Sequence, residues 1–300
     1  MRRLRGACGA VFVLLAAGLI GCSPAVHKSL DPGLSRDVDG LLCRSIIQNE
    51  EISVHVVVYT GLFEGGLIGK AITANRGKDA EERITPLLEQ TADVDFRRLY
   101  WDALQETMRG VGWIQSIKFE PTTVPVNVTK DEIQDQYVLN LTTSYELTPD
   151  CLALMVVTHA ALFYPGQEKA VYHGWLSYFS EPTGDLTEEE AIQAWAADGA
   201  ARYRSLLREG VVENMRMLRA DLLDRGEDAG WQPGEKKTLY FQRPVQKAMR
   251  DLYKTGSFKG EVLADDGTRL LFRFSNGNIW SLARSTANEV KPVVKRHGER

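Results

Sequence analysis

The chain has 300 residues, a formal net charge of −4 and an isoelectric point near 5.8. Hydrophobic residues make up 44% and charged residues 25%, the proportions of an ordinary folded protein. The acidic balance provides no overall basic field, so we expect no nucleic-acid partner. The length suits one medium domain with an appendage, or two small domains.

The N-terminus predicts a lipoprotein signal. Three arginines, at positions 2, 3 and 5, precede an apolar run over residues 10–20. This order is typical of a secretory signal peptide, and the run is shorter than the roughly 20 residues that cross a bilayer as a helix. The tetrad Leu-Ile-Gly-Cys ending at Cys22 resembles the bacterial lipobox, whose cysteine receives a diacylglycerol before cleavage. We therefore expect residues 1–21 to be removed and Cys22 to be lipidated; the alternative is an ordinary signal peptide with an incidental cysteine.

The resemblance to lipoproteins also implies a location. The residue after the lipidated cysteine influences sorting in Gram-negative cells, where an aspartate favours the inner membrane. Here that residue is Ser23, which implies the outer membrane, with the protein held by its N-terminal lipid and facing the periplasm.

Two cysteines remain once Cys8 leaves with the signal and Cys22 is acylated. In an oxidising compartment Cys43 and Cys151 could pair, closing a loop of about a hundred residues. The alternative is two buried free thiols.

Residues 22–48 have the Ser, Pro and Gly content of a tether. We expect an α+β domain over residues 49–228, beginning with a β-branched strand at 52–59. The glycine-rich segment that follows lacks a phosphate-binding pattern, because Glu64 stands where that loop needs glycine, so we expect no nucleotide. Its glycines are spaced four apart and favour either a helix face for self-association or a flexible turn. These glycines are Gly61, Gly65 and Gly69.

The middle of the chain alternates between helical and strand patterns. A helix is predicted over residues 95–109, and a second begins at the capping box of Thr187 and Glu190 and reaches Leu223. Two internal glycines in this second helix, Gly199 and Gly210, predict a kink or close packing. Strands are predicted over residues 114–120, 136–147, 152–164 and 170–180, the last three as an antiparallel meander. The fold class predicted is a two-layer α+β sandwich of a largely antiparallel sheet with helices.

Residues 229–300 are predicted as a small C-terminal unit. A short helix over residues 244–253 precedes three brief strands within 260–283. Asp-Gly and Asn-Gly turns join these strands and favour hairpins, so we expect a small β-meander. The last residues form a basic tail.

The sequence contains few motifs that indicate chemistry. The five histidines form no zinc-binding pattern and no Cys-x-x-Cys pair exists, so we expect no metal and no cofactor, and assign no catalytic residue. His159 and His173 fall on strands predicted to be neighbours, near Cys151 and Asp150 in the sequence. With Cys151 or Asp150, one of these histidines could form a nucleophile-and-base arrangement. Alternatively, both histidines are structural residues of their strands.

Four stretches carry a resemblance to uncharacterised lipoproteins of Gram-negative bacteria, over roughly residues 52–223. They are "GGLIGKAI", "YVLNLTTSYELTPDCLALMV", "VYHGWLSYFS" and "AWAADGAARYRSLLREGVVENMRMLRADL". The element order is also similar to periplasmic lipoproteins related to the curli secretion channel and to lipoprotein activators of peptidoglycan synthases. This resemblance implies an envelope interaction protein and carries no catalytic residues.

The expectation is thus a non-enzymatic, lipid-anchored periplasmic protein that binds or scaffolds another envelope component. One alternative is an envelope hydrolase that uses His159 or His173. Another is a self-assembling ring or channel accessory protein built on the glycine stripe. An enzyme predicts a cleft with converging polar groups and perturbed pKa values, whereas a scaffold predicts an exposed apolar or aromatic patch.

Overall fold

The computed structural model describes residues 40–54 (without 48 and 50), 82–223 (without 110, 112, 113, 125, 127 and 130), 235–245 (without 243 and 244) and 257–289. Several predicted features lie outside the described residues: the signal segment, the lipidation site, the glycine stripe and the basic tail. Their residues are Cys22, Gly61, Gly65 and Gly69, with the tail after residue 289.

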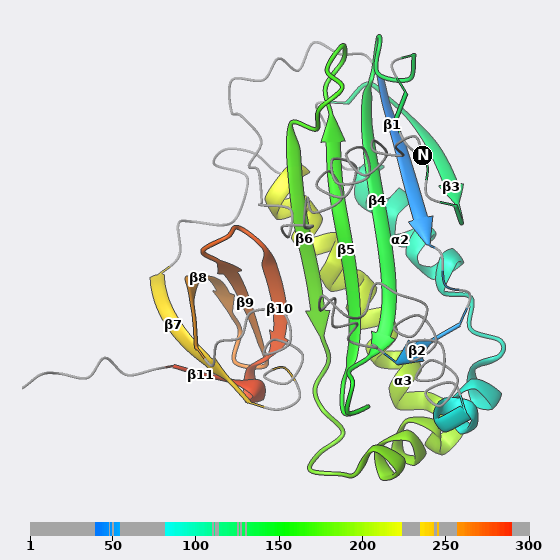
Figure 1. Cartoon of the computed structure of the whole chain (residues 1–300), viewed down its shortest axis with the longest axis vertical. Helices are drawn as coiled ribbons and strands as arrows, with labels where there is room; N and C mark the ends of the chain where they lie inside the picture. The colour runs from blue at the N-terminus through cyan, green and yellow to red at the C-terminus, as the bar shows by residue number, and fades with distance from the viewer. Residues whose placement is uncertain are drawn as a thin grey trace, which may run out of the picture.

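Three long strands form the centre of the sheet (Figure 1). They are β4 (Tyr137–Leu147), β5 (Leu154–Phe163) and β6 (Tyr172–Phe179), and each pairs antiparallel with the next. Apolar and polar side chains alternate along β4, so one face of this strand is packed and the other is partly wet. The predicted meander is confirmed.

The strand β1 (Gly40–Ile47) corrects the predicted tether. It lies between β4 and β3 (Ser116–Thr122), parallel to both. Residues 41–47 are all buried, because they occupy the interior of the sheet. The predicted tether over 22–48 therefore overlaps the folded core at its end. The short β2 (Ser53–Val54) also pairs parallel with β4.

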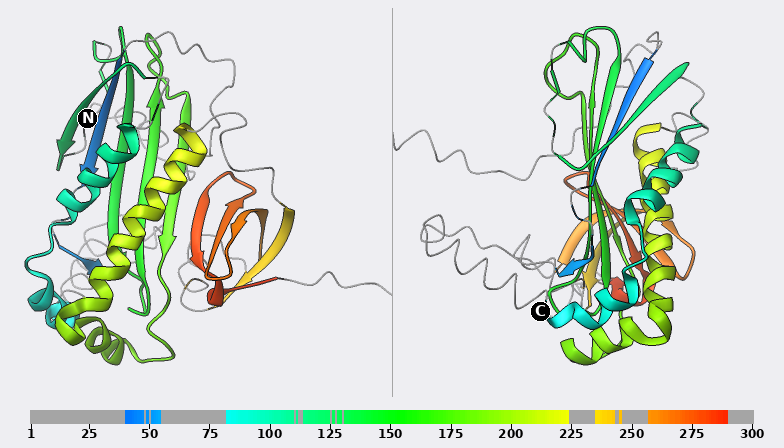
Figure 2. Two further views of the ribbon diagram at one scale, coloured as in Figure 1. Left: turned by 180° about the vertical axis from the view of Figure 1, so that it is seen from behind. Right: turned by 90° about the vertical axis from the view of Figure 1, so that its right-hand side faces the viewer.

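Helices cover one face of this sheet (Figure 2). They are a helix at residues 82–91, α2 (Phe96–Arg109) and α3 (Glu188–Leu218), which ends in the π-helical turn η1 (Arg219–Leu223). The buried residues of α2 are spaced four apart, at positions 96, 100, 104 and 108. The fold is therefore α+β, with a largely antiparallel sheet and a helical layer.

The two glycines of α3 were predicted to mark a kink or close packing, and the structure shows one of each. The capping box of Thr187 and Glu190 opens this helix as expected. Gly199 has a φ of 65° inside a break at residues 197–200. Gly210 packs directly on the sheet, where a Cβ atom would meet Tyr178 and Val156 at 2.8 Å.

The C-terminal strands form the predicted meander but are not separate from the main sheet. They are β7 (Glu235–Phe241), β8 (Ser257–Asp265), β9 (Arg269–Phe274) and β10 (Ile279–Ala283), followed by η3 (Arg284–Thr286) and β11 (Ala287–Glu289). Their two turns place Gly267 and Gly277 at positive φ, as Asp-Gly and Asn-Gly hairpins require.

The link between the two parts is a parallel pairing of β10 with β6. It makes one continuous sheet in the order β11-β7-β8-β9-β10-β6-β5-β4-β1-β3. A second apolar core lies on the face away from α3, where Phe179 of β6 stacks on Trp280 of β10 with ring centroids 4.7 Å apart. Strands on both sides of the predicted boundary at residue 229 thus share their hydrogen bonds and their core.

Candidate functional site

The two histidines considered in the sequence lie together on the sheet face opposite the helices. Side chains alternate along β5, so Thr158 contacts Tyr100 of α2 through a 3.1 Å hydrogen bond while His159 points to the other face. The His159 ring lies 5.8 Å from that of His173, at an interplanar angle of 16°, and 4.8 Å from that of Trp175. His159 thus stacks on His173 and packs at a tilt against Trp175.

This environment keeps His159 neutral. Burial, and to a smaller extent the nearby charge of His173, lowers the pKa of His159 below its ordinary value of 6.5. Its Nε2 is buried, and among the described residues it has no hydrogen-bond partner. A neutral imidazole presents one donor and one acceptor, so His159 retains hydrogen-bonding capacity.

A buried arginine occupies the same face further across the sheet. Arg44 of β1 is 1% exposed and forms ion pairs with Glu120 of β3 at 3.1 Å and with Glu132 at 2.6 Å. Burial alone would lower the pKa of Arg44, but the hydrogen bonds and charges of both glutamates outweigh it and raise that pKa. The backbone amide of Thr129, together with Arg44, lowers the pKa of Glu132. Both carboxylates therefore hold Arg44 in its charged form.

These groups form a row set by the strand register. Arg44 is the cross-strand neighbour of Asn140, which faces Ala161, and His159 lies one pleat further along β5. Arg44 Nη1 and Asn140 Oδ1 are, like His159 Nε2, buried atoms without a hydrogen-bond partner in the described part of the chain. We call Arg44, Asn140 and His159 the polar row. A buried polar atom left unpaired costs about 1–3 kcal/mol, so the polar row is an energetically unfavourable feature of this face.

Cys151 and Asp150, which were considered from the sequence as catalytic partners of the histidines, are not near them. Both lie in the turn that precedes β5, and His159 is five residues beyond Leu154, about 17 Å along the strand. Cys151 also belongs to the core on the helical side, whereas His159 points away from it. The structure therefore does not bring these groups together.

The possible disulfide is also corrected. Cys43 and Cys151 are both buried free thiols. Cys43 pairs in register with Leu139, whereas Cys151 lies beyond the end of β4 at Leu147, about 27 Å further along that strand. A disulfide requires Cα atoms within about 7 Å, so the two cannot be bridged in this fold.

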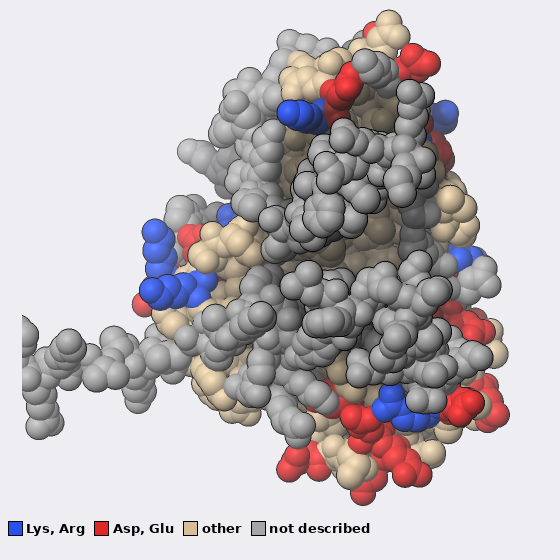
Figure 3. Space-filling model, in the orientation of Figure 1, with Lys and Arg blue, Asp and Glu red and all other residues tan. Residues whose placement is uncertain are grey.

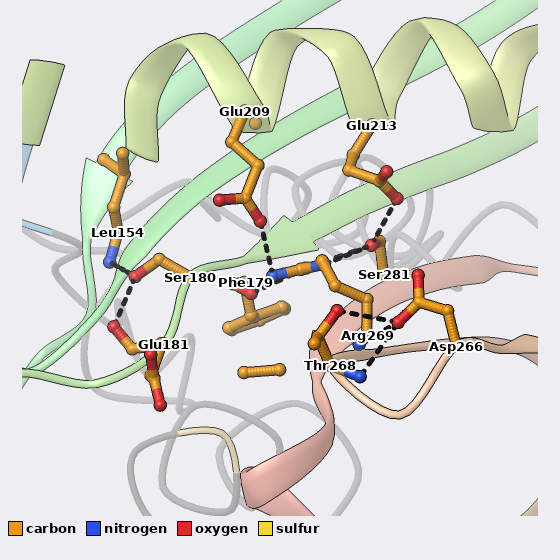
Figure 4. A network of polar contacts seen from close by, with 12 residues as sticks. Leu154, Phe179, Ser180, Glu181, Glu209, Glu213, Asp266, Thr268, Arg269 and Ser281 are labelled. Atoms are coloured by element: carbon orange, nitrogen blue, oxygen red, sulfur yellow. Dashed lines mark hydrogen bonds and ion pairs between the residues drawn. The ribbon is translucent and has the colours of Figure 1, made fainter. Parts of the chain in front are cut away.

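A second polar cluster joins the meander to α3 (Figure 4). Arg269 of β9 bonds Glu209 of α3 at 3.1 Å and Ser281 of β10 at 3.0 Å, and Ser281 donates to Glu213 of α3 at 2.7 Å. The Arg269 guanidinium also lies 4.4 Å above the Tyr178 ring. This cluster fixes the hairpin that carries Arg269 against the helix.

Arg273 forms a matching contact four residues along the same strand. It bonds Asp221 of η1 at 3.0 Å, and Asp221 accepts a 2.6 Å hydrogen bond from the Tyr172 hydroxyl. Burial, with the adjacent Asp221 charge, raises the pKa of Tyr172 well above its usual value, so the hydroxyl stays protonated and donates. Neither arginine was singled out from the sequence. Their spacing in "RLLFRF" does place both on one strand face, opposite Leu270, Phe272 and Phe274.

A hollow of about 590 Å³ opens beside Arg269. Its acidic walls include Glu181, Glu209, Glu213 and Asp266.

Within the residues described, no group of three histidine, cysteine or acidic side chains is placed to hold a metal ion. None of the described helices is long and apolar enough to cross a membrane.

Comparison with known proteins gives little. No protein-family model matches the chain, and no curated protein does. One solved structure that is similar is the crystal structure of protein XCC0632 from Xanthomonas campestris, a protein of the family DUF330. The match covers 65% of this chain and 97% of that one, with 10% sequence identity and a TM-score of 0.25. No property of that protein is carried over to this chain.

Proposed function

We propose that the chain is a lipid-anchored periplasmic protein of the bacterial outer membrane that binds or scaffolds another envelope component. The lipobox-like tetrad ending at Cys22 supports the anchor and the compartment. The fold supplies a long sheet that carries helices on one face and polar groups on the other.

The polar row is the observation that carries the binding role. Buried polar atoms in folded proteins are nearly always hydrogen-bonded, yet Arg44, Asn140 and His159 each leave one such atom unpaired among the described residues. They lie on one face at neighbouring register positions. Because these atoms are covered in the free protein, a partner would complete their hydrogen bonds only by displacing the groups above them. Trp175, half-buried beside His159, adds an aromatic surface to the same face.

The placement of the histidines favours binding over nucleophilic catalysis. A nucleophile and its base must lie within hydrogen-bond reach, about 2.6–3.2 Å. Cys151 belongs to the core on the opposite side of the sheet from His159. Stacking against His173 and Trp175 instead gives His159 the role of a packed, neutral hydrogen-bonding group.

Site-specific photocrosslinking in intact cells tests this function. A photoreactive amino acid replaces Trp175, on the face of the polar row, and in a control strain replaces Glu189, which is exposed at the start of α3. We expect a crosslinked envelope protein from position 175 and not from position 189. The same crosslink should disappear when Cys22→Ala removes the anchor. Equal crosslinking from both positions would contradict a binding face, and recovery of the chain alone would favour self-assembly instead.

A further inference from the structure

The C-terminal meander carries a basic face outside the area covered by α3. In the β7–β8 pair, Lys236 stands opposite Glu261 and Thr238 opposite Lys259. Because side chains alternate along a strand, Lys236, Thr238 and Tyr240 point to the same side as Lys259. Both lysines are exposed, and Tyr240 is 41% exposed. Figure 3 shows basic side chains gathered over the meander.

A surface hollow accompanies these residues. It has a volume of about 470 Å³, and its lining includes Lys236, Lys237, Lys259 and Arg273 with one carboxylate, Glu261. Arg273 contributes a buried Nε that has no hydrogen-bond partner in the described ranges, although its Nη2 bonds Asp221. The hollow therefore presents an excess of cationic donors, one of which is unused.

The basic face contrasts with the acidic character of the rest of the chain. The whole chain carries a net charge of −4, and the end of the molecule where α3 begins exposes Asp185, Glu189 and Asp93. Figure 3 shows acidic side chains collected at that end. Such a charge asymmetry orients a protein in the field of a charged surface. An anionic surface would attract the meander and repel the far end.

We propose that the basic face, defined as Lys236, Lys259, Arg273 and Tyr240, docks on the phosphate groups of an anionic phospholipid bilayer. The proposal rests on the proposed function for the nearness of a bilayer and on charge complementarity for the contact. Lysine ammonium groups bind lipid phosphates as point charges, and a tyrosine suits the boundary between apolar and wet layers. Binding through the basic face would turn the meander towards the membrane and leave the acidic end of α3 facing away.

Vesicle cosedimentation of the full-length chain tests the dock. The probes are vesicles of phosphatidylcholine alone and vesicles that also contain phosphatidylglycerol. Neutral vesicles report on the lipid anchor, and the additional binding to anionic vesicles reports on the basic face. We expect tighter binding to anionic vesicles, with the difference reduced by added salt. The double variant Lys236→Glu and Lys259→Glu should lose at least about tenfold in affinity for anionic vesicles and nothing for neutral ones.

The matched control makes the same charge change elsewhere. Lys118 of β3 and Lys169 are exposed and lie outside the meander, so Lys118→Glu with Lys169→Glu alters the net charge equally. This control should keep most of the preference for anionic vesicles. Equal losses in both double variants, or equal binding of the native chain to both vesicles, would overturn the dock. The proposal would also be overturned if inorganic phosphate protected Lys236 and Lys259 from acetylation while the chain bound anionic and neutral vesicles equally. If binding to neutral vesicles alone is missing, the anchor fails while the dock stands.

Discussion

Gly210 of α3 lies directly against the ring of Tyr178 in β6, so that a Cβ atom on Gly210 would stand 2.8 Å from the ring. Val156 of β5 closes the same space at 2.8 Å. The helix can approach the sheet here only because the residue has no side chain. This contact brings the Glu209 and Glu213 carboxylates of α3 within reach of β9 and β10.

Gly210→Ala should therefore destabilise the fold, although alanine favours a helix by about 1 kcal/mol over glycine. Overpacking of a buried contact typically costs about 1–3 kcal/mol, and Tyr178 is fully buried and has no space to move. We expect a net loss of about 1 kcal/mol in the free energy of unfolding, measured by urea titration. Val212→Ala, on the exposed side of α3, should change it little. A stabilised Gly210→Ala variant would show that the helix is not held this close.

Arg269→Met should loosen the meander from α3. The substitution leaves Glu209 without its cationic partner, removes the hydrogen bonds to Ser281 and removes the cation above Tyr178. Hydrogen bonds to charged groups contribute about 1.5–3 kcal/mol each, so we expect a loss of about 2–3 kcal/mol. Hydrogen exchange should accelerate first in β9. Arg109→Met, which removes an exposed pair with Glu106, should have no measurable effect, and equal effects of both would contradict the role of the Arg269 cluster.

Acidification should destabilise the protein through His159. Its pKa is lowered in the folded state, first by burial and then by His173, so the unfolded chain binds more protons. The free energy of unfolding then rises with pH up to about 6.5 and falls as the pH drops below that value. His159→Gln should flatten this part of the pH profile, measured as urea midpoints from pH 7.5 to 5.5. An NMR titration midpoint of His159 above 6.5 would contradict the burial argument.

The two cysteines should remain reduced in the folded protein. Burial raises the pKa of the Cys43 thiol to about 12, and Cys151 is fully buried. Because the thiolate is the reactive form, we expect native Cys43 and Cys151 to resist alkylation by iodoacetamide and to react once the chain is unfolded. Mass spectrometry of the unfolded protein counts the added groups, with a sample reduced beforehand as the control. Unreactive cysteines in the unreduced sample alone would indicate a disulfide.

Local features of this fold are readable from the sequence. The capping box of Thr187, the alternation in residues 137–147 and the Asp-Gly and Asn-Gly turns each depend on neighbours within a few positions. These features were predicted correctly. Gly199 and Gly210 were also predicted to mark a kink or close packing in α3, and the structure assigns the kink to the first and the close contact to the second.

Long-range features could not be read in the same way. The strand β1 looks unlike a buried strand because Arg44 interrupts it, and Glu120 and Glu132, far along the chain, make that arginine acceptable in the interior. The pairing of β10 with β6 likewise depends on the register of Ile279 against Leu176. No short motif records either relationship. Of the polar row only His159 was considered from the sequence, and Arg44 and Asn140 were missed, since the three residues come from three strands.

The parallel pairing of β10 with β6 also protects the protein while it folds. Until residues 279–283 are in place, the outer edge of β6 exposes unpaired backbone groups that can join another chain. The opposite edge, β3, carries Lys118 and Pro121, which discourage a further strand from pairing there. One edge is thus guarded by its own composition and the other by the last part of the chain, so a C-terminally truncated product would be the form most prone to aggregate.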